Sequence, residues 1–504
     1  MKDLFQRIKP LSIFPIVLAL SLGSALSIRP VTANSIVVNN VADLVANDGL
    51  CTLREAIISA NTDTPSGSAS GECPAGSGAD IISLAAGIYT LTTANLRILS
   101  EITILGETAE TTIIQASTCN PVDPGEICTH DWQVFSVDYS DSYQGHLTLN
   151  GVTLRHGNPG GSGGAVFVDG SIEGYASLHL INSIITANQA RFRGGGIANF
   201  GNLIITNSTL AQNKAEGVDR GEGGAISNYQ DVSISDSNII GNNSYYDGGG
   251  LYNTDGGHVT VSNSTFAENE SARNGGGIYN KEGTLTVTES EFSRNKTTSD
   301  GGGIYNTSLG TVEITSSTFS ENEASIFAGG FYNEGILSIT NSTLSGNYAL
   351  AVGGIFNSGT LTLTSSTLSG NFALMVNKIG GIFNLGGTLE YANTIIANSG
   401  DDVGCTNEEN GIILSNTYNL VEDGSCVGGA IGFVTGDPKL GDLDDNGGPT
   451  LTHALLPGSP AIDAGDPAYC PGSDQRGVAR PQGTGCDIGA FEFVVFVYLP
   501  LIIK

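Results

Sequence analysis

Three residues near the C-terminus have the spacing of a metal-binding loop. Asp442, Asp444 and Asn446 match the first half of a calcium loop, in which alternate side-chain oxygens surround one cation. The last ligand of such a loop would fall on His453, where a bidentate glutamate is needed. The sequence therefore favours a simple Asn-Gly turn here, with a weak calcium site as the alternative. It predicts no other cofactor.

Residues that could catalyse a reaction are not grouped elsewhere in the sequence. The segment 160–164, Gly-Gly-Ser-Gly-Gly, formally matches a nucleophile motif, but that motif acts on a strand-to-helix elbow and here it opens a strand-like repeat. The six histidines are scattered, and no acidic pair recurs at one corner of adjacent repeats. Because glycoside cleavage needs two carboxylates across one bond, we expect no catalytic residue.

Eight cysteines fall in four local pairs. An even number of cysteines in an exported chain predicts disulfides. No Cys-x-x-Cys motif or nearby histidine pair favours zinc instead. On proximity alone, the predicted pairs are Cys51/Cys73, Cys119/Cys128, Cys405/Cys426 and Cys470/Cys486.

The central part of the chain, residues 151–400, consists of repeats of 24 to 29 residues. Each repeat has a Gly-rich step, an alternating apolar run and a closing phrase that ends in asparagine. A period of this size indicates a solenoid. The closing asparagines are Asn188, Asn213, Asn242, Asn269, Asn295, Asn322, Asn347, Asn371 and Asn398.

The alternation within each repeat is two-fold, which indicates strands. Pairs such as Leu285/Val287 flank one polar residue, so both apolar side chains face one side of a strand. Stacked repeats would align these side chains in buried columns. We predict an all-β, single-stranded, right-handed parallel β-helix with three short strands per coil, in which Gly and Asn form corners and amide ladders. One further column is predicted to contain Ile185, Leu210, Ile239, Phe266, Phe292, Phe319, Leu344, Leu368 and Ile395.

The charge balance excludes several classes of partner. The chain has 504 residues and a formal charge of −30. Such an acidic protein is not expected to bind nucleic acid or anionic membrane surfaces. A polyanionic sugar is also disfavoured unless calcium bridges the like charges.

The chain divides into five segments by composition. Residues 1–33 have the basic start, apolar stretch and small-residue cleavage point of an export signal, with a retained anchor as the alternative. Residues 34–150 are predicted to hold an N-terminal cap with one short helix and the first coils, and residues 401–493 a C-terminal cap region with disulfides. Residues 494–504 form an apolar tail, too short to span a bilayer. No membrane span is therefore expected in the mature chain.

Two stretches outside the repeats resemble known families. The segment 51–56, Cys-Thr-Leu-Arg-Glu-Ala, resembles the CSLREA-type motif of secreted bacterial repeat proteins, with Thr52 in place of the usual serine. The segments 445–465 and 474–492 are similar to the choice-of-anchor Q region, and the Gly-Gly-x-x-Asn repeats resemble those of polymorphic outer-membrane proteins. The resemblance implies a secreted or surface β-helix protein, and it brings no agreed activity.

The loop before each Gly step turns from charged to apolar in the last three repeats. Stacked coils would align these loops into an apolar ridge, which a solvated monomer seldom exposes. We expect the chain's own C-terminal segment, or alternatively a partner, to dock there. The predicted docking ridge consists of Phe327, Leu350, Val352, Phe372, Leu374 and Met375.

Together these features predict an extracellular or cell-surface protein with an adhesive, structural or binding role. A surface glycan or another cell-surface component is the expected partner. The alternative is a carbohydrate-active enzyme, either a polysaccharide lyase or a glycoside hydrolase, on a pectate-lyase-like β-helix. A groove lined by three carboxylates and a basic residue would favour the enzyme, and a flat flank rich in Asn and Thr would favour adhesion.

Overall fold

The computed structural model describes residues 34–140, 142–171, 174–375, 378–400 and 402–494. The predicted export signal, 1–33, and all but the first residue of the predicted tail, 494–504, lie outside these ranges. Within them, the only helices are α1 (Leu53–Thr62) and a 3-10 turn at Pro467–Tyr469. No helix in the described residues is long and apolar enough to cross a membrane.

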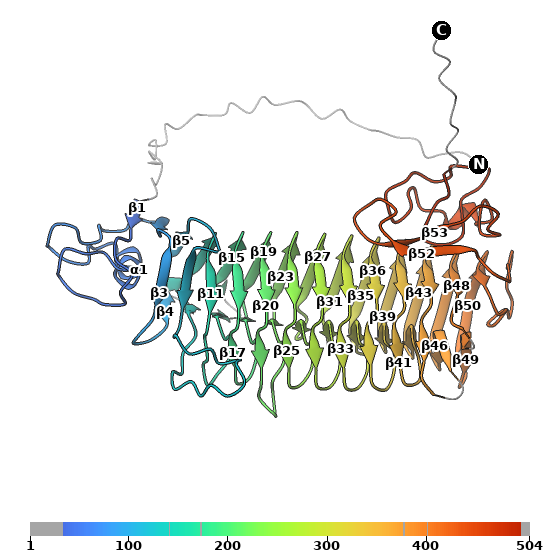
Figure 1. Cartoon of the computed structure of the whole chain (residues 1–504), viewed down its shortest axis with the longest axis horizontal. Coiled ribbons are helices and arrows are strands. Elements are labelled where there is room, and N and C mark those ends of the chain that lie inside the picture. Colours follow the sequence, from blue (N-terminus) through green and yellow to red (C-terminus); the bar gives the residue numbers. More distant parts are fainter. Residues whose placement is uncertain (1–33, 141, 172–173, 376–377, 401, 495–504) are drawn as a thin grey trace, which may run out of the picture.

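The strands wind into a right-handed parallel β-helix, whose coils follow one another along the long axis of the molecule (Figure 1). The predicted fold class is thus confirmed. Three long parallel sheets and one shorter sheet run along this axis.

Neighbouring strands in each parallel sheet come from successive coils. The 14-stranded sheet contains β1 (Asn34–Val37), β2 (Asp80–Ser83), β5 (Glu101–Leu105), β10 (His146–Asn150), β15 (Ser177–Ile181), β19 (Asn202–Thr206), β23 (Asp231–Ser235), β27 (His258–Ser262), β31 (Thr284–Thr288), β35 (Thr311–Thr315), β39 (Ile336–Thr340), β43 (Thr360–Thr364), β47 (Thr388–Ala392) and β50 (Ile412–Thr417). The 13-stranded sheet contains β3 (Gly87–Thr90), β6 (Thr112–Gln115), β11 (Thr153–Arg155), β16 (Ile184–Thr186), β20 (Thr209–Ala211), β24 (Asn238–Ile240), β28 (Thr265–Ala267), β32 (Glu291–Ser293), β36 (Thr318–Ser320), β40 (Thr343–Ser345), β44 (Thr367–Ser369), β48 (Ile395–Ala397) and β51 (Leu420–Val421).

The 12-stranded sheet contains β4 (Leu96–Ile98), β7 (Phe135–Val137), β12 (Val166–Val168), β18 (Ile197–Asn199), β22 (Ile226–Asn228), β26 (Leu251–Asn253), β30 (Ile278–Asn280), β34 (Ile304–Asn306), β38 (Phe331–Asn333), β42 (Ile355–Asn357), β46 (Ile379–Leu385) and β49 (Val403–Glu408). The 8-stranded sheet contains β17 (Gln189–Ala190), β21 (Lys214–Ala215), β25 (Asn243–Ser244), β29 (Glu270–Ser271), β33 (Lys296–Thr297), β37 (Glu323–Ala324), β41 (Tyr348–Ala349) and β45 (Phe372–Ala373). Three antiparallel hairpins are β8 (Tyr139–Ser140) with β9 (Tyr143–Gln144), β13 (Gly170–Ser171) with β14 (Gly174–Tyr175), and β52 (Leu440–Asp444) with β53 (Thr452–Leu455).

The strand register confirms the predicted apolar columns. Leu285 lies opposite Val312 and is buried with it inside the coil. The rings of Phe266, Phe292 and Phe319 stack with centroid distances of 4.8 and 4.6 Å. Each fully buried aromatic side chain contributes about 2–3 kcal/mol, and no single coil could bury it alone.

The last predicted repeat is shifted by one residue. Leu368 lies opposite Ile396, so Ile396 continues the column that was predicted to contain Ile395. The same shift removes Asn398 from the buried ladder. Asn398 is exposed and has a left-handed backbone with φ of 54°.

The other closing asparagines form the predicted amide ladder. Asn269 Nδ2 donates to Asn295 Oδ1 at 2.9 Å, and Asn295 Nδ2 donates to Asn322 Oδ1 at 2.9 Å. A second buried ladder follows the Gly steps, where Asn253 Nδ2 donates to Asn280 Oδ1 at 2.8 Å. Because these amides are satisfied inside the coil, the repeated asparagines are structural.

The glycine steps allow neighbouring coils to approach closely. A Cβ atom at Gly276 would lie 2.6 Å from the carbonyl oxygen of Gly302 in the next coil. The two-residue strands of the 8-stranded sheet precede these steps and are separated from them by a short loop. They add a fourth strand to most coils, where the sequence had indicated three.

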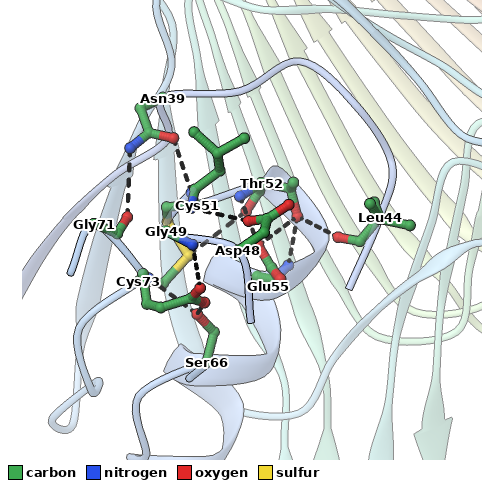
Figure 2. Close-up of a disulfide and its surroundings, with 12 residues drawn as sticks. Asn39, Leu44, Asp48, Gly49, Cys51, Thr52, Glu55, Ser66, Gly71 and Cys73 are labelled. Carbon is green, nitrogen blue, oxygen red and sulfur yellow. Dashed lines mark hydrogen bonds between the residues drawn. A yellow bond between two sulfur atoms is a disulfide. The ribbon is translucent and has the colours of Figure 1, made fainter. Parts of the chain in front are cut away.

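Helix α1 covers the N-terminal end of the solenoid (Figure 1). Thr52 and Glu55 form a capping box in which Glu55 N donates to Thr52 Oγ1 and Thr52 N donates to Glu55 Oε2 at 3.0 Å (Figure 2). The Cys51–Cys73 disulfide ties this cap to the loop that follows it. Arg54 pairs with Asp43, so both charged residues of the motif are structural.

The C-terminal region folds back along the side of the solenoid, next to β36–β48 of the 13-stranded sheet (Figure 1). A buried network holds it together. Arg476 pairs with Asp474 at 2.7 Å and lies 3.4 Å from the centroid of the Phe491 ring, and Arg480 lies 3.6 Å from Glu492. The two arginines thus pair with carboxylates inside the cap.

Three of the four predicted disulfides are present, namely Cys51–Cys73, Cys119–Cys128 and Cys405–Cys426. Cys470 and Cys486 are thiols in this structure. Burial and the adjacent Cys470 side chain together raise the pKa of the Cys486 thiol to about 12. The fourth disulfide therefore stays a prediction.

Candidate functional site

The outer face of the 12-stranded sheet carries a column of aromatic rings. Tyr252, Tyr279, Tyr305 and Tyr332 occupy the middle position of successive strands and stack with centroid distances of 5.4, 5.1 and 4.6 Å. Nearly parallel rings cover one another's faces, so the column stabilises the stack of coils and presents mainly ring edges. Burial raises the pKa of each of these tyrosines, and that of Tyr332 to about 12.

A charged column runs beside the aromatic one, at the residue before each Gly step. Arg193, Glu222 and Asp247 come from adjacent coils, because Arg193 bridges to Glu222 and Gly223 N donates to the Asp247 carbonyl at 3.0 Å. Arg193 Nε lies 3.2 Å from Glu222 Oε2. Asp300 occupies the same position two coils after Asp247. Acidic residues therefore do recur at one corner, contrary to the expectation from the sequence.

Asp247 is the most perturbed carboxyl of this column. Burial raises its pKa to about 6, Arg273 and a hydrogen bond from Asn274 oppose the shift, and Glu222 adds to it. Burial also raises the pKa of Asp300. A carboxyl whose pKa is raised toward neutral can exchange protons with a ligand.

A cleft of about 400 Å³ lies at the N-terminal end of this face. Phe200 and Tyr229 stack with a centroid distance of 4.4 Å, and Arg193 lies 5.0 Å from the centroid of the Tyr229 ring. The hairpin of β13 and β14 supplies one wall through Tyr175. The lining residues are Gly170, Tyr175, Arg193, Phe200, Tyr229, Gln230 and Asp255.

A second cleft, of about 520 Å³, adjoins the first one. Phe167 lines it, and its ring lies 5.5 Å from that of Phe200 in the first cleft. Asp131 and Arg191 also line it, together with residues 159–162. The Gly-x-Ser-x-Gly segment thus belongs to a loop that opens a coil, as expected, and not to a strand-to-helix elbow.

The predicted calcium residues lie on the hairpin of β52 and β53. Asp442 and Asp444 are exposed, and Asn446 Nδ2 donates to the Thr452 carbonyl at 2.8 Å, as in a simple turn. The described residues contain one group of potential metal ligands, Cys119, Glu126 and Cys128, whose cysteines form a disulfide. The calcium site stays a prediction.

The predicted docking ridge is partly buried within its own loops. Val352 is buried with Phe356, and Phe327 packs against it with the two rings 5.3 Å apart. Leu374 and Met375 are 61% and 52% exposed, and Leu350 and Phe372 are also exposed.

The described part of the C-terminal segment does not cover this ridge. It lies on the 13-stranded sheet, because hydroxyl and amide side chains there bond to its backbone. Self-docking by the described C-terminal residues is therefore not observed, and residues 495–504 lie outside the described ranges. Docking of a partner on the ridge stays a prediction.

The cleft was not predicted from the sequence. The charged loops before the Gly steps were recognised, but the placement of Glu222 and Asp247 at one corner of adjacent coils was not. The loop at residues 215–222 is longer than the loops at the same corner of the following coils, which hides the register of Glu222 and Asp247. An alignment of the repeats on the Gly step, rather than on the closing asparagine, places Glu222 and Asp247 at the same position.

One family model agrees with this class of fold. Residues 142–330 match a family model described as a right-handed β-helix region. Similar solved structures are a PL6-family alginate lyase, AlyGC (13% identity, TM-score 0.45), and the pectate lyase Pel9A (15% identity, TM-score 0.36). The alignments cover 80% and 92% of this chain, with 56% of the alginate lyase and 97% of the pectate lyase. The chain therefore spans about half the length of the alginate lyase. No curated protein sequence matches.

Proposed function

We propose that the protein is an extracellular or surface-attached β-helix protein that binds a neutral glycan in the cleft of Tyr175, Phe200 and Tyr229. The supporting observation is the lining of this cleft, which combines three aromatic side chains with an arginine, an amide and a carboxylate. Ligand sites of this kind pair apolar ring surface with a few polar groups that fix orientation. The apolar C–H faces and hydroxyl groups of a sugar complement both.

A neutral glycan fits the electrostatics better than an acidic one. The protein carries a formal charge of −30. The one arginine of the cleft already pairs with Glu222 at 3.2 Å, so little positive charge remains for a carboxylate or sulfate on the ligand. The adjoining cleft at Phe167 would extend the site along a polysaccharide chain.

The proposed location follows from the cysteines and from the sequence. Three disulfides fit an oxidising compartment. We also propose that residues 1–33 are an export signal. The same proposal places the chain in the CSLREA and choice-of-anchor Q families. The buried Arg476–Asp474 pair supports a cap role for the C-terminal motif. Surface attachment itself would be tested by cell fractionation.

A glycan array followed by calorimetry with the bound sugars tests the proposal. Tyr229→Ala removes ring surface from the cleft and should weaken binding at least about 10-fold, because the ring contact and its desolvation are lost. Tyr305→Ala is the matched control, since it removes a ring from the stack outside the cleft. Failure to bind any glycan, or equal losses in both variants, would contradict the proposal.

A second candidate function is glycan cleavage. The specific observation in its favour is the raised pKa of Asp247, about 6, beside Glu222. Glycoside hydrolysis requires two carboxyls, one of which has a raised pKa and acts as the general acid. New reducing ends or unsaturated products from a bound glycan, abolished in Asp247→Asn, would establish an enzyme. Binding without any product would leave the protein as a binding module.

A further inference from the structure

A column of left-handed turn residues follows the strands of the 14-stranded sheet. Their φ angles lie between 45° and 52°. We name them the turn column. Its members are Asn182, Asn207, Asp236, Asn263, Glu289, Ser316, Asn341, Ser365 and Asn393.

The C-terminal members of the turn column bind polypeptide backbone. Asn341 Nδ2 donates to the Ser473 carbonyl at 2.8 Å, and Ser365 Oγ donates to the Tyr469 carbonyl at 3.3 Å. Asn393 Nδ2 donates to the Asp466 carbonyl at 3.0 Å, and Asn393 Oδ1 accepts from Asp466 N at 2.6 Å. These contacts hold the C-terminal region on the solenoid.

The first residues of the strands in the 13-stranded sheet form a neighbouring column, and three threonines of this column act in the same way. Thr318 Oγ1 donates to the Leu451 carbonyl at 2.6 Å, and Thr367 Oγ1 accepts from Ala490 N at 3.0 Å. At the other end of the solenoid, Thr153 Oγ1 donates to the Ala109 carbonyl at 2.6 Å. The two columns together therefore form a track for polypeptide backbone.

A cleft of about 500 Å³ lies on this track between the loop 106–110 and the following coils. Asn182, Asn207 and Thr209 line it, and Thr209 occupies the same strand position as Thr318. Asn207 Nδ2 donates to Asn182 Oδ1 at 2.7 Å, and Asn182 Nδ2 donates to Asn150 Oδ1 at 3.2 Å. Each amide has two N–H groups and two lone pairs. Asn182 and Asn207 are exposed and line the cleft, and this ladder uses only one N–H group of each amide.

Exposed carboxylates line the same cleft. Glu107 and Glu110 lie on its loop side. They favour a cationic side chain and disfavour an acidic ligand.

We propose that this cleft binds an extended polypeptide segment that carries a lysine or arginine. The amides of Asn182 and Asn207 bond to its backbone, as Asn341 and Asn393 do to the C-terminal region. Glu107 and Glu110 pair with its basic side chain. This site is separate from the aromatic cleft, so its test is independent of the proposed glycan binding.

The test pans a phage-displayed random peptide library against the full chain and measures affinities of synthetic copies of the enriched peptides. Asn182→Gly with Asn207→Gly removes both amides and keeps the left-handed turns, since Gly151 has the same role one coil earlier with φ of 69°. We expect enrichment of peptides with Lys or Arg and at least about 10-fold weaker binding to the double variant. Asn263→Gly, in the same column but outside the cleft, is the control and should leave binding unchanged.

Glu107→Gln with Glu110→Gln gives a second readout that does not depend on the turns. This variant should weaken binding and reduce its dependence on salt. The proposal is overturned if no peptide is enriched, or if enriched peptides bind all variants equally. It is also overturned if a glycan on an array loses binding in the double glycine variant, because the cleft would then be a sugar site.

Discussion

The side-chain amide of Asn393 forms two hydrogen bonds with the backbone of Asp466. Its Oδ1 accepts from Asp466 N at 2.6 Å, and its Nδ2 donates to the Asp466 carbonyl at 3.0 Å. Asn393→Gly keeps the left-handed backbone and removes both bonds. At about 1 kcal/mol net for each bond, we expect the docked C-terminal region to lose about 2 kcal/mol. Hydrogen exchange should be faster across residues 437–493 and unchanged in the coils. Asn263→Gly is the control, and equal exchange in both variants would contradict the prediction.

Phe292 tests the stacked core column. Phe292→Ala leaves a cavity between two rings and should cost about 3–5 kcal/mol. Phe292→Leu should cost less than about 1.5 kcal/mol, because Leu344 and Leu368 occupy the same column in later coils. Urea unfolding of both variants measures the difference. Similar costs for Leu and Ala would show that the ring stack, and not the filled volume, decides stability.

Asp247 should make stability depend on pH. Its pKa is raised from 3.8 to about 6 in the folded protein, mainly by burial, so the folded state keeps a proton that the unfolded chain has lost. The contribution of this proton to the free energy of unfolding is fully present below about pH 4 and is lost as the pH rises through about 6. It is on the order of 2–3 kcal/mol in total. The side chain of Asp247→Asn cannot ionise, so this variant should not lose stability from this site as the pH rises.

The measurement compares urea unfolding of the wild type and Asp247→Asn at several pH values from about 4 to 7. Asp487 also has a pKa raised to about 6, and it is present in both proteins, so the difference between them isolates Asp247. Asp231→Asn, at an exposed position on β23, is the control. A constant difference between the wild type and Asp247→Asn across this range would rule out the perturbed carboxyl.

Cys470 and Cys486 should form a fourth disulfide under oxidising conditions. They are adjacent thiols in the cap, and an oxidising compartment favours their oxidation. Mass spectrometry of a non-reduced digest should show the two cysteines in one linked peptide pair. Full alkylation of both thiols without prior reduction would contradict the prediction.

The regular coils could be predicted because each one repeats the same local pattern. Leu285/Val287 and the Phe266–Phe292–Phe319 column follow from two-fold alternation and a constant period, and both proved right. The last coil was misplaced by one residue, since Ile395 and Ile396 are both apolar and both fit the pattern.

The candidate site and the docked C-terminal region were harder to predict, because they depend on contacts that no repeated sequence pattern indicates. Glu222 and Asp247 occupy one corner only after a longer loop is allowed for. The docked C-terminal region depends on pairs such as Thr343 and Gln475, which are 132 residues apart in sequence. No local pattern encodes such a pair.

The uniform stacking has a consequence for how such a protein can change size. Since each coil touches mainly the coils before and after it, removing one whole repeat, such as residues 276–301, would leave every ladder continuous. The molecule would simply become shorter by about 4.8 Å, the spacing between neighbouring strands. The length of the solenoid can therefore be increased or decreased by whole coils, while its two ends and the docked C-terminal region stay unchanged.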